Sequence, residues 1–429
     1  MRDIADEGAR QSPGHFVAHP YRWGFALVVS LFFLWALANN FNDILIRHFQ
    51  KALGLSRGEA GFIQFVFYIG YFLVAIPAGL LMRRFSYRAG ILTGLCLYAA
   101  GALLFFPASS LLSYPAFLLA LFVIAAGAAC LETTANAYIG AFGSPDSAVQ
   151  RLNLAQAFNG LGAFLAPILG GWLIFSGVEH SATFLQNMTP SDLAAYRASE
   201  AHTVRLPYLM LAISALMIAG AVTIARLPSA EEDGSGALGE FKRLLRNRTL
   251  MGAVVAQFFY VGAQVGIWSF FIDFVKDVRP DISERQAALL LSASLLLFTL
   301  GRFTGTALMS RIQPPRLLGI YAVANIVLCA VAASGSGWLA LGALILTSFF
   351  MSIMFPTIFG LGVTGLDRGR PLGSALIIMA IIGGAIFPPL MGLIAERPTG
   401  VPLALLLPLG CFAVIALYAS RARHADRLA

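Results

Sequence analysis

Charged residues are scarce in this sequence. Asp, Glu, Lys and Arg make up only 12% of the 429 residues, whereas an ordinary soluble domain holds about 25%. Histidine and cysteine are also rare, with 6 and 4 copies. No histidine lies deep in an apolar run, and the cysteines all lie within such runs, at Cys96, Cys130, Cys329 and Cys411. We therefore expect neither a soluble domain nor a disulfide framework nor a metal centre.

Long apolar runs take the place of the missing charges. Hydrophobic residues make up 58% of the chain, and the mean hydropathy is +0.78. A helix needs about 20 apolar residues to cross the hydrocarbon layer, and such runs must be helical because lipid cannot pair exposed backbone groups. The sequence predicts an all-α polytopic membrane protein with twelve spans, at residues 23–46, 58–82, 89–107, 114–142, 148–176, 204–226, 249–277, 285–309, 316–334, 337–363, 371–396 and 399–421.

The longest polar connection after the sixth span suggests how the chain is divided. We predict a tail at 1–22, a six-helix half at 23–226, a linker at 227–248, a second six-helix half at 249–421 and a tail at 422–429. Most of the 29 Lys and Arg residues fall on one side of the membrane if both tails are cytoplasmic. The net charge of +8 then reflects this asymmetry and contact with anionic lipid headgroups, and it does not indicate nucleic acid.

An internal repeat supports the division into halves. "GLLMRRFSYRAG" at 79–90 is similar to "GTALMSRIQPPRLLG" at 305–319, and "GAFLAPILGG" at 162–171 is similar to "GAIFPPLMGL" at 384–393. The two pairs have nearly the same offset, so one duplication explains both. Two parallel six-helix halves around a central cavity are the arrangement expected of a major facilitator, with the substrate between the halves.

Acids interrupt the predicted spans at Asp43, at Glu132 and, close to the end of its span, at Asp273. An ionised carboxylate at the bilayer centre costs about 2.5–3.5 kcal/mol on insertion scales. An acid without a cationic partner avoids this cost by taking up a proton. Arg302 is the one basic residue deep in a span, so Asp43 and Glu132 are candidates for proton coupling. The alternative is that each acid bonds a neighbouring hydroxyl or backbone group and fixes helix packing.

Amide and aromatic residues also recur at helical spacing, so that they share helix faces. The sets are Asn40 with Asp43, Gln64 with Tyr68 and Tyr71, Glu132 with Asn136, Asn153 with Gln156 and Asn159, and Gln257 with Tyr260, Gln264 and Trp268. Amides can bond sugar hydroxyls, and aromatic faces can cover the C–H surfaces of a sugar ring. These faces predict a sugar site, although amides also join neighbouring helices in membranes at about 0.6 kcal/mol per contact.

Seven stretches carry a resemblance to a known family: "FLWALANNFNDIL", "GFIQFVFYIGYFLVAIPAGLLMRRFSYRAGI", "CLETTANAY", "RLNLAQAFNGLGA", "QFFYVGAQVGIWSF", "GRFTGT" and "FMSIMFPTIFGLG". Together they resemble the fucose–proton symporter family of the major facilitator superfamily, and the resemblance covers nearly the whole chain. The resemblance implies that Asp43 and Glu132 take part in proton coupling and sugar binding, and that Asn40, Gln156 and Asn159 line the cavity. It also implies a substrate such as L-fucose, glucose, galactose or N-acetylglucosamine. Asp273 departs from the family pattern.

The resulting hypothesis is a proton-coupled sugar importer that works by alternating access. We expect a monomer in the inner membrane of a bacterium, surrounded by lipid, with sugar and protons as its partners and no cofactor besides the proton as coupling ion. Two alternatives remain at this stage: a proton-coupled efflux antiporter of the same superfamily and a non-transporting sugar sensor. A membrane enzyme is not expected, because the sequence shows no metal-ligand cluster or phosphate-binding glycine loop.

Overall fold

The computed structural model describes residues 16–53, 57–173, 187–228, 237–366, 369–395 and 400–426. Within these ranges the chain is helical and contains no strand. The first half comprises α2 (Arg22–Leu53), α3 (Arg57–Arg84), α4 (Tyr87–Leu111), α5 (Tyr114–Tyr138), α6 (Ala148–Leu173), α8 (Pro190–Thr203) and α9 (Arg205–Ile224). The second half comprises α11 (Arg248–Ser269), α12 (Phe271–Val278), α13 (Glu284–Leu308), α14 (Pro314–Ser334), α15 (Gly337–Met351), α16 (Met354–Val363), α17 (Arg370–Met379), α18 (Gly383–Ala395), α19 (Gly400–Ala404) and α20 (Leu406–Asp426).

Eleven helical stretches of the described residues are long and apolar enough to cross a membrane. The predicted fifth span corresponds to α6, which is just as long but has polar side chains along its first half. Each predicted span therefore has its helix. The boundaries differ in places: α2 continues to Leu53, beyond the predicted end at residue 46, and α8 occupies part of a segment that we expected to be a connection.

Spans seven, ten, eleven and twelve are each divided into shorter helices, the twelfth at Leu405 between α19 and α20. The seventh changes from α11 to α12 at Phe270, and the tenth changes from α15 to α16 at Ser352 and Ile353. The eleventh passes from α17 through the 3₁₀ turn η5 (Ala380–Ile382) into α18. Pro356 explains the break in span ten, since proline has no amide hydrogen for the carbonyl four residues earlier. That carbonyl belongs to Ser352, so the break leaves it available to a side chain.

Close packing of α4 against α5 depends on glycine. A Cβ atom at Gly127 would lie 2.5 Å from the amide nitrogen of Tyr98, and one at Gly101 would lie 2.5 Å from the amide nitrogen of Ile124. Small residues at such points let helix backbones approach each other in the membrane, where dispersion contacts replace the hydrophobic effect as the source of cohesion.

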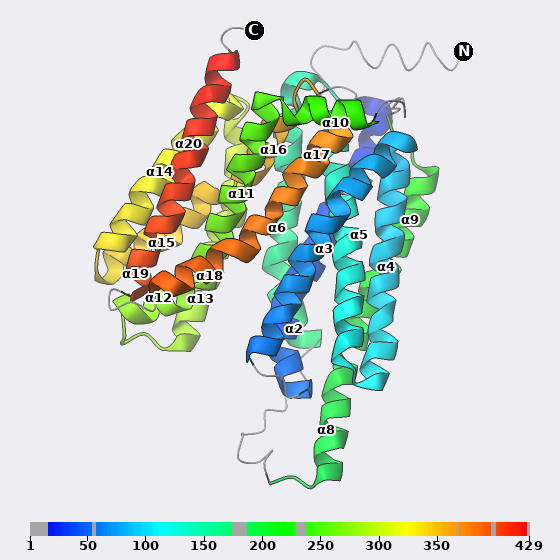
Figure 1. The fold of residues 1–429 in the computed structure, drawn as a ribbon, viewed down its shortest axis with the longest axis vertical. Helices are drawn as coiled ribbons and strands as arrows, with labels where there is room; N and C mark the ends of the chain where they lie inside the picture. Colours follow the sequence, from blue (N-terminus) through cyan, green and yellow to red (C-terminus); the bar gives the residue numbers. More distant parts are fainter. Residues whose placement is uncertain are drawn as a thin grey trace.

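The two halves meet at the end of the bundle where α10 (Ala237–Leu245) lies across the helices, which we call the α10 end (Figure 1). Here a Cβ atom at Gly79 of α3 would lie 2.9 Å from both the Pro371 carbonyl oxygen and the Ala375 Cβ of α17. The largely buried side chain of Arg83, also on α3, forms a 3.1 Å ion pair with Glu240 of α10. At this end α3 therefore packs directly on α17 of the second half, and an ion pair ties α3 to the linker helix α10.

The outer surface of the bundle is apolar. Leu119, Met217, Val327 and Leu417 are each more than half exposed. On a soluble protein such side chains would gather into a patch that promotes association. On a bundle of spanning helices they are the surface that faces lipid tails.

The α4–α5 contact leads to a test of stability. We expect Gly127→Ala to lower the melting temperature of the detergent-solubilised protein, because the new methyl group would overlap the backbone of α4 at a cost of about 1–3 kcal/mol. Gly220→Ala on α9 is the matched control, since a Cβ there meets no atom within 4 Å. Equal melting temperatures for Gly127→Ala and the wild type would contradict this account of the contact.

Candidate functional site

A cavity of about 490 Å³ lies between the two halves. Helices α2, α3, α5 and α6 form one wall, and α11, α13, α16 and η5 form the other. This volume lies within the range of small-molecule sites, which is about 300–1,000 Å³. The first wall includes Trp35, Asn39, Asn40, Tyr68, Tyr71, Glu132, Gln156 and Asn159. The second includes Gln264, Trp268, Leu291, Leu295, Phe298, Thr299, Arg302, Phe355 and Ile381.

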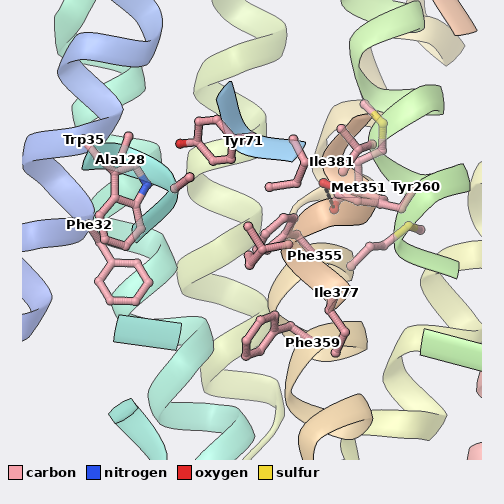
Figure 2. Packing of buried hydrophobic residues seen from close by; sticks show 14 of the residues in the cluster. Phe32, Trp35, Tyr71, Ala128, Tyr260, Met351, Phe355, Phe359, Ile377 and Ile381 are labelled. Atoms are coloured by element: carbon pink, nitrogen blue, oxygen red, sulfur yellow. Dashed lines mark hydrogen bonds between the residues drawn. The ribbon is translucent and has the colours of Figure 1, made fainter. Parts of the chain in front are cut away.

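The two walls differ in chemistry. Among the described residues, the first wall holds most of the amides and one carboxylate, whereas the second is mainly aromatic and aliphatic. Figure 2 shows Trp35 and Tyr71 on one side, with Phe355 and Ile381 across from them. A ligand in this cavity would therefore meet hydrogen-bonding groups on one face and apolar surface on the other.

Glu132 supplies the carboxylate of the first wall. It projects from α5 and is only 7% exposed. Among the described residues it forms no salt bridge within 4.0 Å, and its carboxylate interacts with the Tyr71 side chain. Asn39 Nδ2 donates to the Tyr71 hydroxyl oxygen at 3.3 Å, so the tyrosine proton can point to Glu132. Glu132 is thus a buried acid that lies beside a hydroxyl group.

Arg302 connects the two walls. From α13 its Nη1 donates to three acceptors on α6: the Gln156 carbonyl, Gln156 Oε1 at 3.2 Å and Asn159 Oδ1 at 3.1 Å. Its guanidinium also lies 4.6 Å from the centre of the Phe298 ring, and its charge acts on Glu132. The one arginine deep in a span is therefore committed to amides of the opposite half.

The break in span ten supplies two further acceptors to the site. Arg302 Nε donates to the Ser352 carbonyl at 3.2 Å, and this is the carbonyl left without a helical partner by Pro356. Tyr260 Oη donates to the Met351 carbonyl at 3.1 Å, a bond drawn in Figure 2. The broken backbone is thus paired by side chains from α11 and α13, as a non-aqueous surrounding requires.

The structure brings many of the predicted binding residues to the cavity. Those in its walls are Asn40, Tyr68, Glu132, Gln156, Asn159, Gln264 and Trp268. Asn40 and Asn159 each donate to a backbone carbonyl of α2, those of Ala36 at 2.7 Å and Phe32 at 3.2 Å. The side-chain oxygen of Asn159 accepts from Arg302. No donor to the side-chain oxygen of Asn40 is found among the described residues.

Three predicted binding residues lie behind the walls. Asn136 Oδ1 accepts from Gln156 Nε2 at 3.2 Å, so Asn136 supports a wall residue and does not itself line the cavity. Tyr260 is fully buried with its hydroxyl bonded to Met351. Gln257 is fully buried, and no partner for its amide atoms is found in the described part of the chain. Gln257 and Tyr260 share a helical face with Gln264 and Trp268, but only the latter two lie in the cavity wall. The first turns of this face of α11 pack in the core, and its later turns line the cavity.

Two other predicted residues lie outside what the structure describes. Asp43 falls within α2 and Gln64 within α3, but their side chains are not among the described ones. The proton-coupling role of Asp43 stays a prediction from the sequence.

Several wall residues were not predicted from the sequence, notably Trp35, Asn39 and Phe298 in the cavity and Arg302 as a bridge between the halves. Arg302 could have been predicted as a site residue, because an ionisable residue inside a span is a functional-site candidate by default. Asn39 precedes Asn40 in an amide-rich run and could have been considered with it. Phe298 had no signal, since one phenylalanine among 34 carries no pattern.

The family follows from comparison with known proteins. The sequence profile described as "Major Facilitator Superfamily" matches residues 25–388 of the chain. The chain is 44% identical to the L-fucose-proton symporter of Escherichia coli over 421 residues, which is 96% of this chain and 95% of that protein. The chain belongs to the fucose–proton symporter family of the major facilitator superfamily. It is a multi-pass membrane protein.

Other relatives agree with this assignment. The Glucose/galactose transporter of Brucella abortus is 37% identical to this major facilitator over 401 residues, 92% of this chain and 93% of the relative. The crystal structure of the transporter FucP in the outward conformation superposes with a TM-score of 0.88 at 44% identity, covering 94% of this chain and 99% of that one. The proton:xylose symporter XylE, with a TM-score of 0.62 and 15% identity, shares the fold.

The role of Arg302 as a bridge can be tested by Arg302→Lys. Lysine is a point charge that cannot reproduce the guanidinium fork or its stacking on Phe298. We expect the variant to lose about 2 kcal/mol or more of stability, seen as a melting temperature several degrees below wild type in detergent. Arg311→Lys at an exposed position is the control. A variant as stable as the control would show that Arg302 does not join the halves.

Proposed function

We propose that this protein imports a monosaccharide together with a proton. The observation that carries the proposal is Glu132, a buried carboxylate without a salt bridge among the described residues, in the wall of a cavity that also holds amides and aromatic rings. Relatives over most of the chain carry the names L-fucose-proton symporter and glucose/galactose transporter, and this supports the same class of activity here.

Sugar binding would use both walls. Asn40, Gln156 and Asn159 present amides to the cavity, and an amide can bond a hydroxyl as donor and acceptor. The aromatic second wall would cover the C–H face of the ring. We propose that L-fucose, glucose, galactose and N-acetylglucosamine are the substrates to test first, since the cavity favours this ring chemistry without selecting one of them.

Coupling would follow from the cost of enclosing a charge. Closing the cavity around an ionised Glu132 would remove the carboxylate from water, which costs several kcal/mol. Protonation from the outside removes that penalty, so closure would be favoured only when the proton is bound. We propose Glu132 as one proton site and Asp43, two helical turns beyond Ala36 on α2, as a second.

Alternating access would open the ends of the bundle in turn. We propose that both termini and the α10 end face the cytoplasm of a bacterial cell whose inner membrane holds the protein as a monomer. The α10 end is joined by the α3–α17 packing and the Arg83–Glu240 ion pair. The structure then corresponds to a carrier closed towards the cytoplasm, in keeping with the outward conformation of FucP, to which it is similar.

Radiolabelled-sugar uptake into proteoliposomes tests the proposal directly. We expect accumulation when the outside is acidified and none after a protonophore collapses the gradient. One proton moving through 100 mV supplies about 2.3 kcal/mol, which sustains roughly a fifty-fold sugar gradient. An efflux antiporter would instead move substrate against the direction of the protons, and a sensor would bind sugar without accumulating it.

Glu132→Gln isolates the proton step. The amide keeps the shape of the side chain but cannot gain or lose a proton, so we expect accumulation to fall at least tenfold and its dependence on external pH to flatten. Exchange of labelled for unlabelled sugar, which needs no net proton movement, should persist. Asp146→Asn, at an exposed acid near the α10 end, is the control.

Asp43→Asn is assessed in the same assay, with the same loss of accumulation expected. If Glu132→Gln and Asp43→Asn both accumulated sugar like wild type, proton coupling through these acids would be wrong.

A further inference from the structure

Trp268 is the one cavity tryptophan on the second wall, and its indole N–H points away from the cavity. Trp268 Nε1 donates to Ser348 Oγ on α15 at 3.0 Å. Ser348 is fully buried and is not part of the cavity wall. The polar edge of the ring is therefore occupied by the protein, which leaves carbon surface for a ligand.

A second serine continues this bond. Ser294 on α13 is fully buried, and its Oγ lies 2.7 Å from Ser348 Oγ. Ser294 Oγ also lies 3.3 Å from the Ile345 carbonyl of α15. The chain of contacts thus connects α11, α13 and α15.

The number of available protons fixes the direction of this chain. An indole nitrogen can only donate, a carbonyl can only accept, and each hydroxyl has one proton to give. Ser348 must accept from Trp268 and give its proton to Ser294, and Ser294 must give its proton to the Ile345 carbonyl. In this arrangement each buried N–H and O–H donor has an acceptor. If either serine hydroxyl pointed the other way along the chain, one buried donor would have no acceptor.

Ring packing holds the indole from another side. Phe298 meets Trp268 edge-to-face, with ring centres 5.0 Å apart and an angle of 84° between the planes. The Arg302 guanidinium lies over Phe298 at 4.6 Å. The orientation of Trp268 is thereby linked to the residue that joins the two halves.

We propose that Ser348, supported by Ser294, is a positioning residue that fixes Trp268 as an apolar platform for the C–H face of the transported sugar. This rests on the proposed function and deepens it, because it assigns ring-face recognition to the second wall. Substrates with a continuous C–H face are favoured, and the indole N–H makes no bond to the sugar. Ser348 acts only through the ring it orients.

Ser348→Ala tests the proposal in uptake assays with the sugar that wild type transports. Loss of one oriented hydrogen bond should raise KM roughly three- to tenfold, with the maximal rate within about twofold of wild type. Thr347→Val, on the same helix, is the matched control, because the Thr347 hydroxyl bonds the carbonyl of Leu344 within its own helix. KM of the control should not change.

The decisive comparison uses Trp268→Phe, which keeps an aromatic ring but has no N–H. In that background Ser348→Ala should leave KM unchanged, since no indole remains to be oriented. A purely structural role of Ser348 would raise KM by the same factor in both backgrounds and would overturn the proposal, as would an unchanged KM for Ser348→Ala alone.

A second serine variant and the activity of wild type itself separate the remaining outcomes. Should Ser348→Ala not fold, Ser294→Ala carries the same comparison, with a smaller rise in KM expected in the wild-type background and none beside Trp268→Phe. Failure of wild type to accumulate any sugar would count against the proposed function. Accumulation by wild type with no effect of either serine would reject only the positioning role.

Discussion

The structure depends on one constraint: polar groups inside a membrane need partners that the lipid cannot provide. Arg302 shows how this works. Its guanidinium lies deep in a span and bonds to acceptors on α6 and to the free carbonyl of Ser352. The pairing of one charge therefore holds two helices of opposite halves in register. Glu132 is close enough to experience that charge, but it forms no salt bridge with any described residue.

Broken helices extend the same principle. Pro356 removes one backbone hydrogen bond from span ten, and the open carbonyls at the break accept from Tyr260 and Arg302. On the far side of the cavity Tyr71 interacts with Glu132 and accepts a hydrogen bond from Asn39. Most polar side chains near the cavity thus already bond to other groups of the protein. A ligand can bind only to the acceptors, donors and ring faces that remain. Because so many polar groups are already paired, only a small set of contacts remains for a sugar within a large cavity.

Much of the fold could be predicted from the sequence, because hydrocarbon thickness sets the length of an apolar run. The twelve spans and the cavity positions of Asn40, Glu132, Gln156 and Asn159 followed from run length, from buried-charge cost and from family resemblance. Gln257 and Tyr260 did not follow, because α11 faces the core at one end and the cavity at the other. Helical periodicity identifies a shared face but does not say which neighbour covers each turn of it.

The sequence by itself determined that the chain crosses a membrane many times, and which polar residues lie inside it, since both depend on local composition. Only the tertiary structure decided which of those residues meet. The pairing of Arg302 with Gln156 and Asn159, and of Trp268 with Ser348, joins residues far apart in the chain. These contacts depend on how helices of the two halves pack, on the close approach allowed by glycine, and on where proline opens the backbone.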